Sequence, residues 1–256
     1  MTNKFLRLAG GLVLAAALLP GALAANVAAS RYDAAIESQV KNTLSKKPAF
    51  HNVEATTEDG IVTLSGTTEL YQQKLDAAKK IRHAEHVAGV RNLIEVSGAQ
   101  VSDDELRQKL ARKLAYDRVG YADNVFSALT LDVKNGVASV GGEVYQDLDR
   151  TSALDLVART PGVKDVVDNV KVLPTSIFDN DIRLRTARAI YRDPMLSRYA
   201  MVPAAPIRIV VDHGHVTLYG AVDSQLDKQL AGVRANQVFG VFGVDNQLTV
   251  PNQVAR

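Results

Sequence analysis

The side chains best suited to metal or acid–base chemistry are a few histidines. His213 and His215 flank Gly214 in an H-G-H sequence, and two imidazoles there could share a transition metal. A metal site needs three or four ligands, however, and no third ligand is evident nearby. His83 and His86 lie three residues apart without a neighbouring cysteine or glutamate motif. The sequence therefore predicts no metal site and no cofactor, and we interpret H-G-H as a hairpin turn.

Catalytic motifs are missing from the sequence. There is no cysteine, no G-x-S-x-G sequence, no P-loop and no dinucleotide-binding fingerprint. A Ser-His-Asp triad cannot be assigned, because these residues fall in a different context in each repeat. We therefore predict a protein that is not an enzyme, and keep an enzyme with an unrecognised site as the weakest hypothesis.

The most suggestive binding residues lie between positions 185 and 201. Arg185, Arg188 and Arg192 are spaced i, i+3, i+7, away from the apolar stripe of the same predicted helix. Tyr199 and Met201 follow just beyond the helix. Arginines beside aromatic and apolar groups suit the boundary of an anionic lipid headgroup layer. The alternative is a solvated helix face followed by a loop that packs on its own domain.

A signature that occurs three times determines the elements that carry these residues. It reads D-G-I-V-T-L-S-G at 59–66, N-G-V-A-S-V-G-G at 135–142 and H-G-H-V-T-L-Y-G at 213–220. Each copy pairs a turn glycine with a second glycine six residues later: Gly60 and Gly66, Gly136 and Gly142, Gly214 and Gly220. After the second glycine, 24 residues lead each time to a valine that opens another apolar alternation: Val90, Val166 and Val244. The chain is therefore an array of three similar units.

Each unit has the same predicted order of elements. Apolar residues at i, i+4, i+8 predict a first helix, and two alternating runs joined at the turn glycine predict a hairpin. We expect the second glycine to end the hairpin, where a side chain would crowd the turn into the next helix. A second helix and a last strand complete an α-β-β-α-β unit. The predicted fold is α+β, with two helices on one face of a three-stranded sheet.

The predicted domains are 32–98, 102–173 and 178–250, separated by short linkers. Linkers of about five residues keep neighbouring units in contact. Because repeats contact only their neighbours, we expect substitutions in one unit to leave the unfolding of the others largely unchanged. The oligomeric state does not follow from the sequence.

Residues 1–24 have the pattern of a signal peptide. Lys4 and Arg7 precede an apolar run from 8 to 19, and small residues at 22–24 suit cleavage. The run is too short to span a bilayer, which needs about 20 residues. No cysteine is present for lipidation, so we expect a soluble exported protein that is not a lipoprotein. The remaining chain has 30 − 2 = 28 basic and 28 − 0 = 28 acidic residues, which argues against nucleic-acid binding.

The glycines, the helix and the final strand together resemble the BON domain, named for bacterial osmotically inducible and nodulation proteins. The final strand reads V-x-x-V-x-N-x-[LV]-x-V, with Asn92 in the first unit and Asn246 in the third. The second unit differs, since Asp168 takes the asparagine position and Asn169 follows it. The resemblance implies a periplasmic or envelope protein linked to osmotic or envelope stress. Several family members look like phospholipid binders, and the resemblance supplies no catalytic residues.

These observations favour a non-catalytic periplasmic binding protein. Its expected partner is anionic phospholipid or an envelope protein, held by weak multivalent contacts, with Arg185, Arg188, Arg192, Tyr199 and Met201 as the candidate surface. The alternative is a periplasmic protein-interaction scaffold, or a chaperone-like partner, without lipid affinity.

Overall fold

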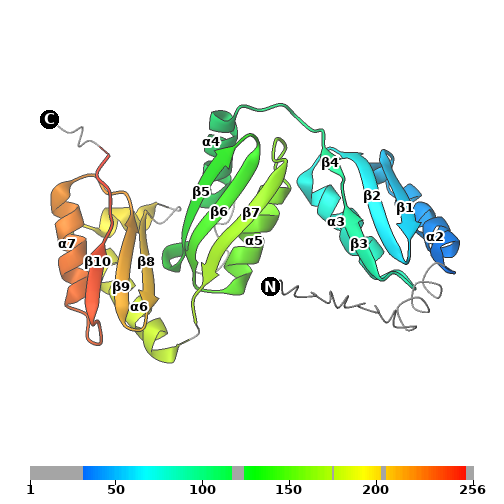
Figure 1. Ribbon diagram of the computed structural model, residues 1–256. Helices are drawn as coiled ribbons and strands as arrows, with labels where there is room; N and C mark the ends of the chain where they lie inside the picture. The colour runs from blue at the N-terminus through cyan, green and yellow to red at the C-terminus, as the bar shows by residue number, and fades with distance from the viewer. Residues whose placement is uncertain (1–30, 117–123, 175, 203–205, 252–256) are drawn as a thin grey trace, which may run out of the picture.

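The protein folds into three successive α+β domains, seen in a computed structural model (Figure 1). The structure describes residues 31–116, 124–174, 176–202 and 206–251. The predicted signal peptide, 1–24, lies outside the described residues. Within the described ranges, no helix has the length and apolar character needed to cross a membrane.

Every domain has the order helix, strand, strand, helix, strand, which confirms the predicted fold. The elements of the first domain are α2 (Asp33–Ser45), β1 (Val53–Glu58), β2 (Ile61–Thr68), α3 (Tyr71–Arg82), β3 (Gly89–Asn92) and β4 (Glu95–Val96). Those of the second are α4 (Asp103–Tyr116), β5 (Ala128–Lys134), β6 (Val137–Val144), α5 (Asp147–Ala158) and β7 (Asp165–Val172). Those of the third are α6 (Ile177–Tyr191), β8 (Ile207–Asp212), β9 (His215–Gly220), α7 (Gln225–Asn236) and β10 (Gly243–Asn246).

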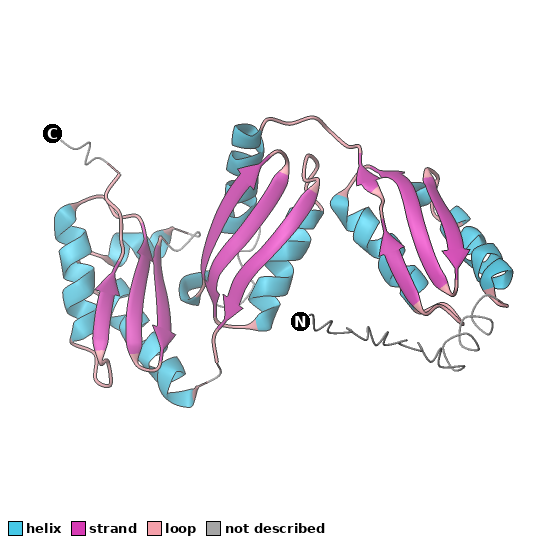
Figure 2. Ribbon diagram, in the orientation of Figure 1, coloured by secondary structure: helices cyan, strands magenta, loops and turns pink. Residues whose placement is uncertain are grey.

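The second strand of each hairpin is the centre of its sheet. It pairs antiparallel with the first strand and parallel with the strand that follows the second helix. Both helices cover one face of each sheet (Figure 2). The predicted helix stripes face these cores: Ile36, Val40 and Leu44 in the first domain, Leu106 and Leu110 in the second, and Ile182, Thr186 and Ile190 in the third are buried.

The hairpin turns are tied to the first helix by a carboxylate. In every domain an aspartate in the first turn of that helix accepts the two backbone N–H groups of the turn, at 2.7 to 3.1 Å. The three aspartates are Asp33, Asp103 and Asp179. The N–H groups of Gly136 and then Asn135 lower the pKa of Asp103. His213 has a φ of 50°, like Asp59 and Asn135 at the same turn position, so it is a turn residue as expected.

The second glycine of each signature has a different role from the one expected. Gly66 and Gly142 lie inside β2 and β6, two residues before these strands end, and Gly220 ends β9. All three have positive φ, and an added Cβ would lie 1.8 to 2.0 Å from a carbonyl oxygen of the residue that precedes the paired strand position. The glycine is therefore required by the close approach of the opposing strand, not by the turn into the next helix.

The final strand of each domain contains a polar residue, which is asparagine in the first and third domains and aspartate in the second. Its contacts explain this difference. Asn92 and Asn246 each donate from Nδ2 to a backbone carbonyl of the second helix, at 2.8 and 2.6 Å, and accept a backbone N–H two residues ahead. An aspartate cannot donate. Asp168 keeps only the acceptor role, toward the N–H of Val170, and pairs instead with the side chain of Arg150. Arg150 stands 18 residues earlier, as Lys228 does before Asn246.

We expect Asn246→Asp to destabilise the third domain by roughly 1–3 kcal/mol, because it leaves the Lys228 carbonyl facing a carboxylate. The reverse change, Asp168→Asn, should cost about 1 kcal/mol or less, since it removes only a partly exposed ion pair. Denaturant unfolding of both full-length variants checks this. Adding Lys228→Arg to Asn246→Asp should restore part of the loss by recreating the second domain's pair. Equal costs for the two single substitutions would contradict the assignment.

The second and third domains share an apolar interface. Val125, Phe126 and Tyr145 of the second domain pack against the core cluster of the third. Val210 of β8 is 1% exposed and packs with Ala128 and Leu173. The equivalent positions on the outer sheet face of the other domains are Thr56 and Asp132, and both are solvent-exposed. The third domain thus has valine where the other two have a polar residue, because the second domain covers this position.

A buried arginine lies at the same interface. Arg183 is fully buried, donates from Nη2 to the carbonyl of Val211 at 2.6 Å, and stacks over the ring of Tyr145 at 4.5 Å. Burial lowers its pKa, and the charge of Asp179 opposes that shift. The contact between domains is therefore specific, and it couples the second domain to the third more closely than expected for independent repeats.

Candidate functional site

Of the three arginines singled out in the sequence, Arg185 and Arg188 lie on the outward face of α6, and Arg192 directly follows the helix. All three side chains are exposed, as expected for a face opposite the core stripe. Arg185 forms an ion pair with Asp181 one turn earlier, at 2.7 Å. Arg188 and Arg192 make no side-chain hydrogen bond or ion pair with any residue that the structure describes. These two guanidinium groups are therefore available to an anion.

The unpaired arginines meet a third one from the neighbouring helix. A shallow pocket of about 370 Å³ is lined by Arg188 and Arg192 of the α6 end and by Arg234 of α7. Asp193 lies in the same pocket and binds Arg234 at 2.8 Å. Burial alone would raise the pKa of Asp193, but the Met195 N–H and Arg234 lower it overall. With three guanidinium groups and one carboxylate, the pocket has an excess of positive charge.

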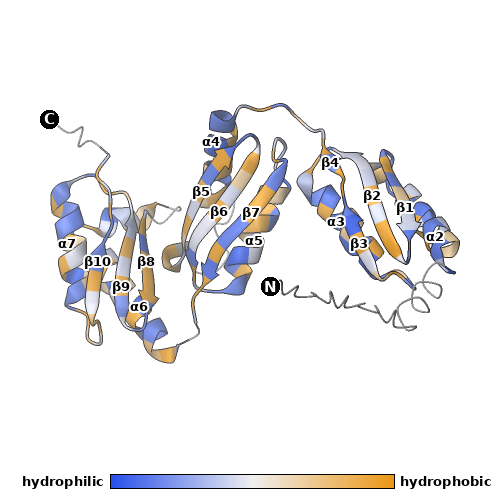
Figure 3. Ribbon diagram, viewed as in Figure 1, coloured by the Kyte–Doolittle hydropathy of each residue, from blue (hydrophilic) through white to orange (hydrophobic). Residues whose placement is uncertain are grey.

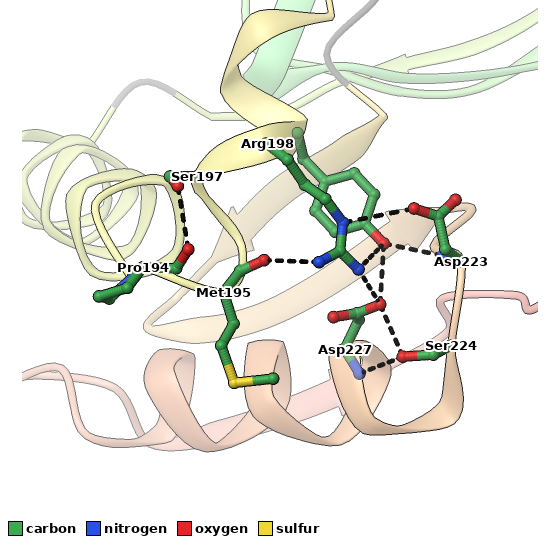
Figure 4. Close-up of polar contacts among 8 residues, drawn as sticks. Pro194, Met195, Ser197, Arg198, Asp223, Ser224 and Asp227 are labelled. Carbon is green, nitrogen blue, oxygen red and sulfur yellow. Dashed lines mark hydrogen bonds and ion pairs between the residues drawn. The ribbon is translucent and has the colours of Figure 1, made fainter.

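Tyr199 does not belong to this surface, which corrects the expectation from the sequence. Its side chain is 5% exposed and packs in the third domain's core. Its hydroxyl donates to Asp227 at 3.0 Å and accepts the N–H of Asp223 at 2.8 Å, and burial raises its pKa. Figure 4 shows Arg198 reaching between Asp223 and Asp227 at this point.

A short 3-10 helix buries an aromatic ring in the loop after each first helix, and Tyr199 is the third domain's ring. Phe50 and Phe126 are the corresponding aromatic residues of the other two domains. Met201, in contrast, is 84% exposed and lines neither arginine pocket of the third domain. Of the five candidate residues, Arg188 and Arg192 share one pocket, Arg185 lines a second pocket one helical turn away, and Tyr199 and Met201 line neither.

An exposed apolar surface at one end of the third domain was not predicted from the sequence. We call it the aromatic tip and define it as Ile177, Phe178, Phe239 and Phe242, which are 79 to 87% exposed. Ile177 and Phe178 begin α6, and the other two lie between α7 and β10; the start of α6 is hydrophobic in Figure 3. The three phenylalanines line a hollow of about 760 Å³ together with Arg185 and His213.

The histidines do not form a metal site within the described part of the chain. No group of three or more potential ligands occurs there. His213 binds its neighbour Asp212 at 2.6 Å, and His215 packs edge-on against Phe242. His86 stacks on Tyr32 with ring centroids 3.9 Å apart. His86, His213 and His215 thus each have a structural contact of their own.

Comparison with solved structures yields only distant similarities. The C-terminal domain of CdsD, the structural protein of the type III secretion system of Chlamydia trachomatis, is 12% identical, with a TM-score of 0.24, and the match covers 83% of this chain and 96% of that chain. The periplasmic domain of the type III secretion inner membrane protein PrgH from S. typhimurium is 11% identical, with a TM-score of 0.20, covering 83% and 99%. Scores this low support no inference about assembly. No curated protein matches the chain.

The family model gives a clear result. The BON domain model matches residues 32–98, 102–174 and 180–252, which together make up most of the chain. Domains of this family are in general non-catalytic binding domains. The chain belongs to the BON-domain family and contains three copies of the domain.

Proposed function

We propose that this protein binds anionic phospholipid at the cell envelope, through the third domain, as a non-catalytic periplasmic protein of osmotic or envelope stress. The observation that carries the proposal is the pair of exposed, unpaired arginines, Arg188 and Arg192, which share a pocket with Arg234. Side chains four residues apart on a helix lie about 6 Å from each other, close enough to share one phosphate. Guanidinium groups bind phosphate oxygens through paired hydrogen bonds.

The charge distribution supports a local site rather than a generally basic protein. Residues 33–98 have 8 basic and 9 acidic side chains, residues 102–173 have 10 and 12, and residues 179–250 have 8 and 7. Of the three domains, the third alone has an excess of basic residues, and two of its arginines have no partner among the described residues. A negatively charged bilayer would therefore attract the third domain in preference to the other two.

Vesicle flotation tests the proposal with the full-length mature protein. It should float with vesicles that contain phosphatidylglycerol and remain at the bottom with vesicles of phosphatidylcholine alone. Raising the salt from about 0.1 M to about 1 M shortens the screening length from about 10 Å to about 3 Å and should release much of the bound protein. If the protein floats with neither vesicle and instead cross-links to an envelope protein, the scaffold alternative is correct.

A further inference from the structure

The aromatic tip exposes more apolar surface than the fold requires. Three phenylalanine side chains at 79 to 85% exposure lie at one end of the third domain, contributed by two separate segments. Single exposed apolar residues are common, but a contiguous group of large ones usually marks a contact surface. The burial of these rings elsewhere would release about 1.5–3 kcal/mol each. Covering the aromatic tip would therefore be favourable in free energy.

The other two domains show that the fold does not need these rings. In each domain a side chain that follows the second helix lies over the turn glycine. It is Ala88 in the first domain, Lys164 in the second and Phe242 in the third. Three residues earlier the sequence has Glu85, Pro161 or Phe239. The residue before the aspartate that binds the hairpin turn is Tyr32 in the first domain, Ser102 in the second and Phe178 in the third. At these three positions the first and second domains thus have mostly polar or small residues, whereas the third domain has phenylalanine at every one.

The position of the tip relative to the arginines indicates what covers it. Phe178 and Arg188 belong to the same helix, ten residues apart, which corresponds to about 15 Å along its axis. Arg185, paired with Asp181, lines the hollow between the phenylalanines, and Arg188 follows it by one turn, so the apolar surface leads along α6 to the unpaired arginines. A surface that is apolar at one end and cationic beside it matches a bilayer, whose acyl chains lie directly beneath anionic headgroups.

We propose that the aromatic tip inserts Phe178, Phe239 and Phe242 below the headgroups of an anionic phospholipid bilayer while the arginines of α6 bind the headgroup phosphates. This inference rests on the proposed function and adds to it a fixed orientation and an apolar contribution to affinity. Rings at the interface enter about 5–10 Å into the boundary between headgroups and acyl chains. Binding would then be only partly released by salt, because burial of the rings is not screened.

The absence of tryptophan from the chain allows a direct test. Phe242→Trp places one fluorophore in the tip, and Lys164→Trp places one at the equivalent position of the second domain, over Gly136. On phosphatidylglycerol vesicles, Phe242→Trp should show a blue-shifted emission and should be quenched by lipids brominated on the acyl chains. The Lys164→Trp control should show neither effect. Circular dichroism and denaturant unfolding establish that both variants fold like the parent.

A loss-of-function variant supplies the second measurement. Phe239→Ser with Phe242→Ser should reduce vesicle affinity by about a hundredfold, or about tenfold for each ring. Because both side chains are largely exposed, folding should be preserved. With the apolar contribution reduced, raising the salt should remove a larger share of the remaining binding free energy than in the parent.

Each other outcome overturns the insertion. If the parent binds vesicles and Phe242→Trp shows no shift, the tip stays in water while the headgroup function stands. If the parent does not bind, both proposals fail. A blue shift that depends on protein concentration and needs no lipid would assign the tip to contacts between copies of this chain.

Discussion

Gly142→Val is expected to unfold the second domain. Gly142 has a φ of 95°, a conformation that β-branched residues almost never adopt, and its added Cβ would lie 2.0 Å from the carbonyl oxygen of Ala128. The backbone strain alone costs about 1–3 kcal/mol, and separating β5 from β6 to relieve the clash costs more. A domain of about 70 residues has a total stability of roughly 4–10 kcal/mol, so most of it would be lost. Circular dichroism and limited proteolysis measure the result.

The matched control is Gly89→Val in the first domain. Nothing lies within 4 Å of a Cβ added at Gly89, so the substitution should be tolerated. In Gly142→Val, the third domain should lose stability because Phe126 and Tyr145 no longer support its core. The first domain should be affected less, since its packing on the second domain's core is through Tyr71 of α3. A stable Gly142→Val protein would show that the close approach to Ala128 is not required.

The fold was predictable because its signals are local and repeat three times. Apolar residues at i, i+4, i+8 determine which face of a helix is buried, and a turn glycine after an alternating run determines a hairpin. The contact between the helix aspartate and the hairpin turn also had a sequence signal that was not recognised, since Asp33, Asp103 and Asp179 each stand three residues before the first buried apolar residue of their helix. The role of Gly142 was misjudged, because the clash involves a carbonyl on the opposing strand, which only the register reveals.

The candidate site was predicted less well, for reasons specific to each residue. Arg188 lies on α6 and Arg192 directly follows it, so helical spacing indicates exposure, and both are exposed. The pairing of Arg185 with Asp181 follows an i, i+4 rule and could have been anticipated. Tyr199 lies in a loop, where no periodicity distinguishes a buried ring from an exposed one. The aromatic tip combines residues more than 60 positions apart, which only the folded chain brings together.

Replacing Arg185, Arg188 and Arg192 by glutamine is expected to weaken binding to anionic vesicles by about thirty- to a hundredfold. Each basic residue near the surface contributes about 1 kcal/mol, less for Arg185 because Asp181 already pairs with it, which gives roughly 2–3 kcal/mol. Glutamine has nearly the helix propensity of arginine, so α6 should form as before. Unfolding curves of the variant and the parent check that the third domain remains folded.

The chain offers a control with the same change in net charge. Lys109 and Arg112 of α4 occupy the positions of Arg185 and Arg188, and Lys46 after α2 occupies that of Arg192, counted from the aspartates that bind the hairpin turns. Replacing these three by glutamine removes three positive charges while leaving the third domain unchanged. If the third domain carries the binding, this control should retain affinity within a few-fold of the parent.

The most direct test of the third domain as the lipid-binding domain is a titration of parent, triple variant and control with phosphatidylglycerol vesicles at one ionic strength. We predict a large loss of affinity for the variant changed at Arg185, Arg188 and Arg192 and almost none for the control changed at Lys46, Lys109 and Arg112. Equal losses would mean that binding depends on total charge rather than on one domain. Undiminished binding by both would mean that the arginines at the end of α6 serve only to offset the helix dipole.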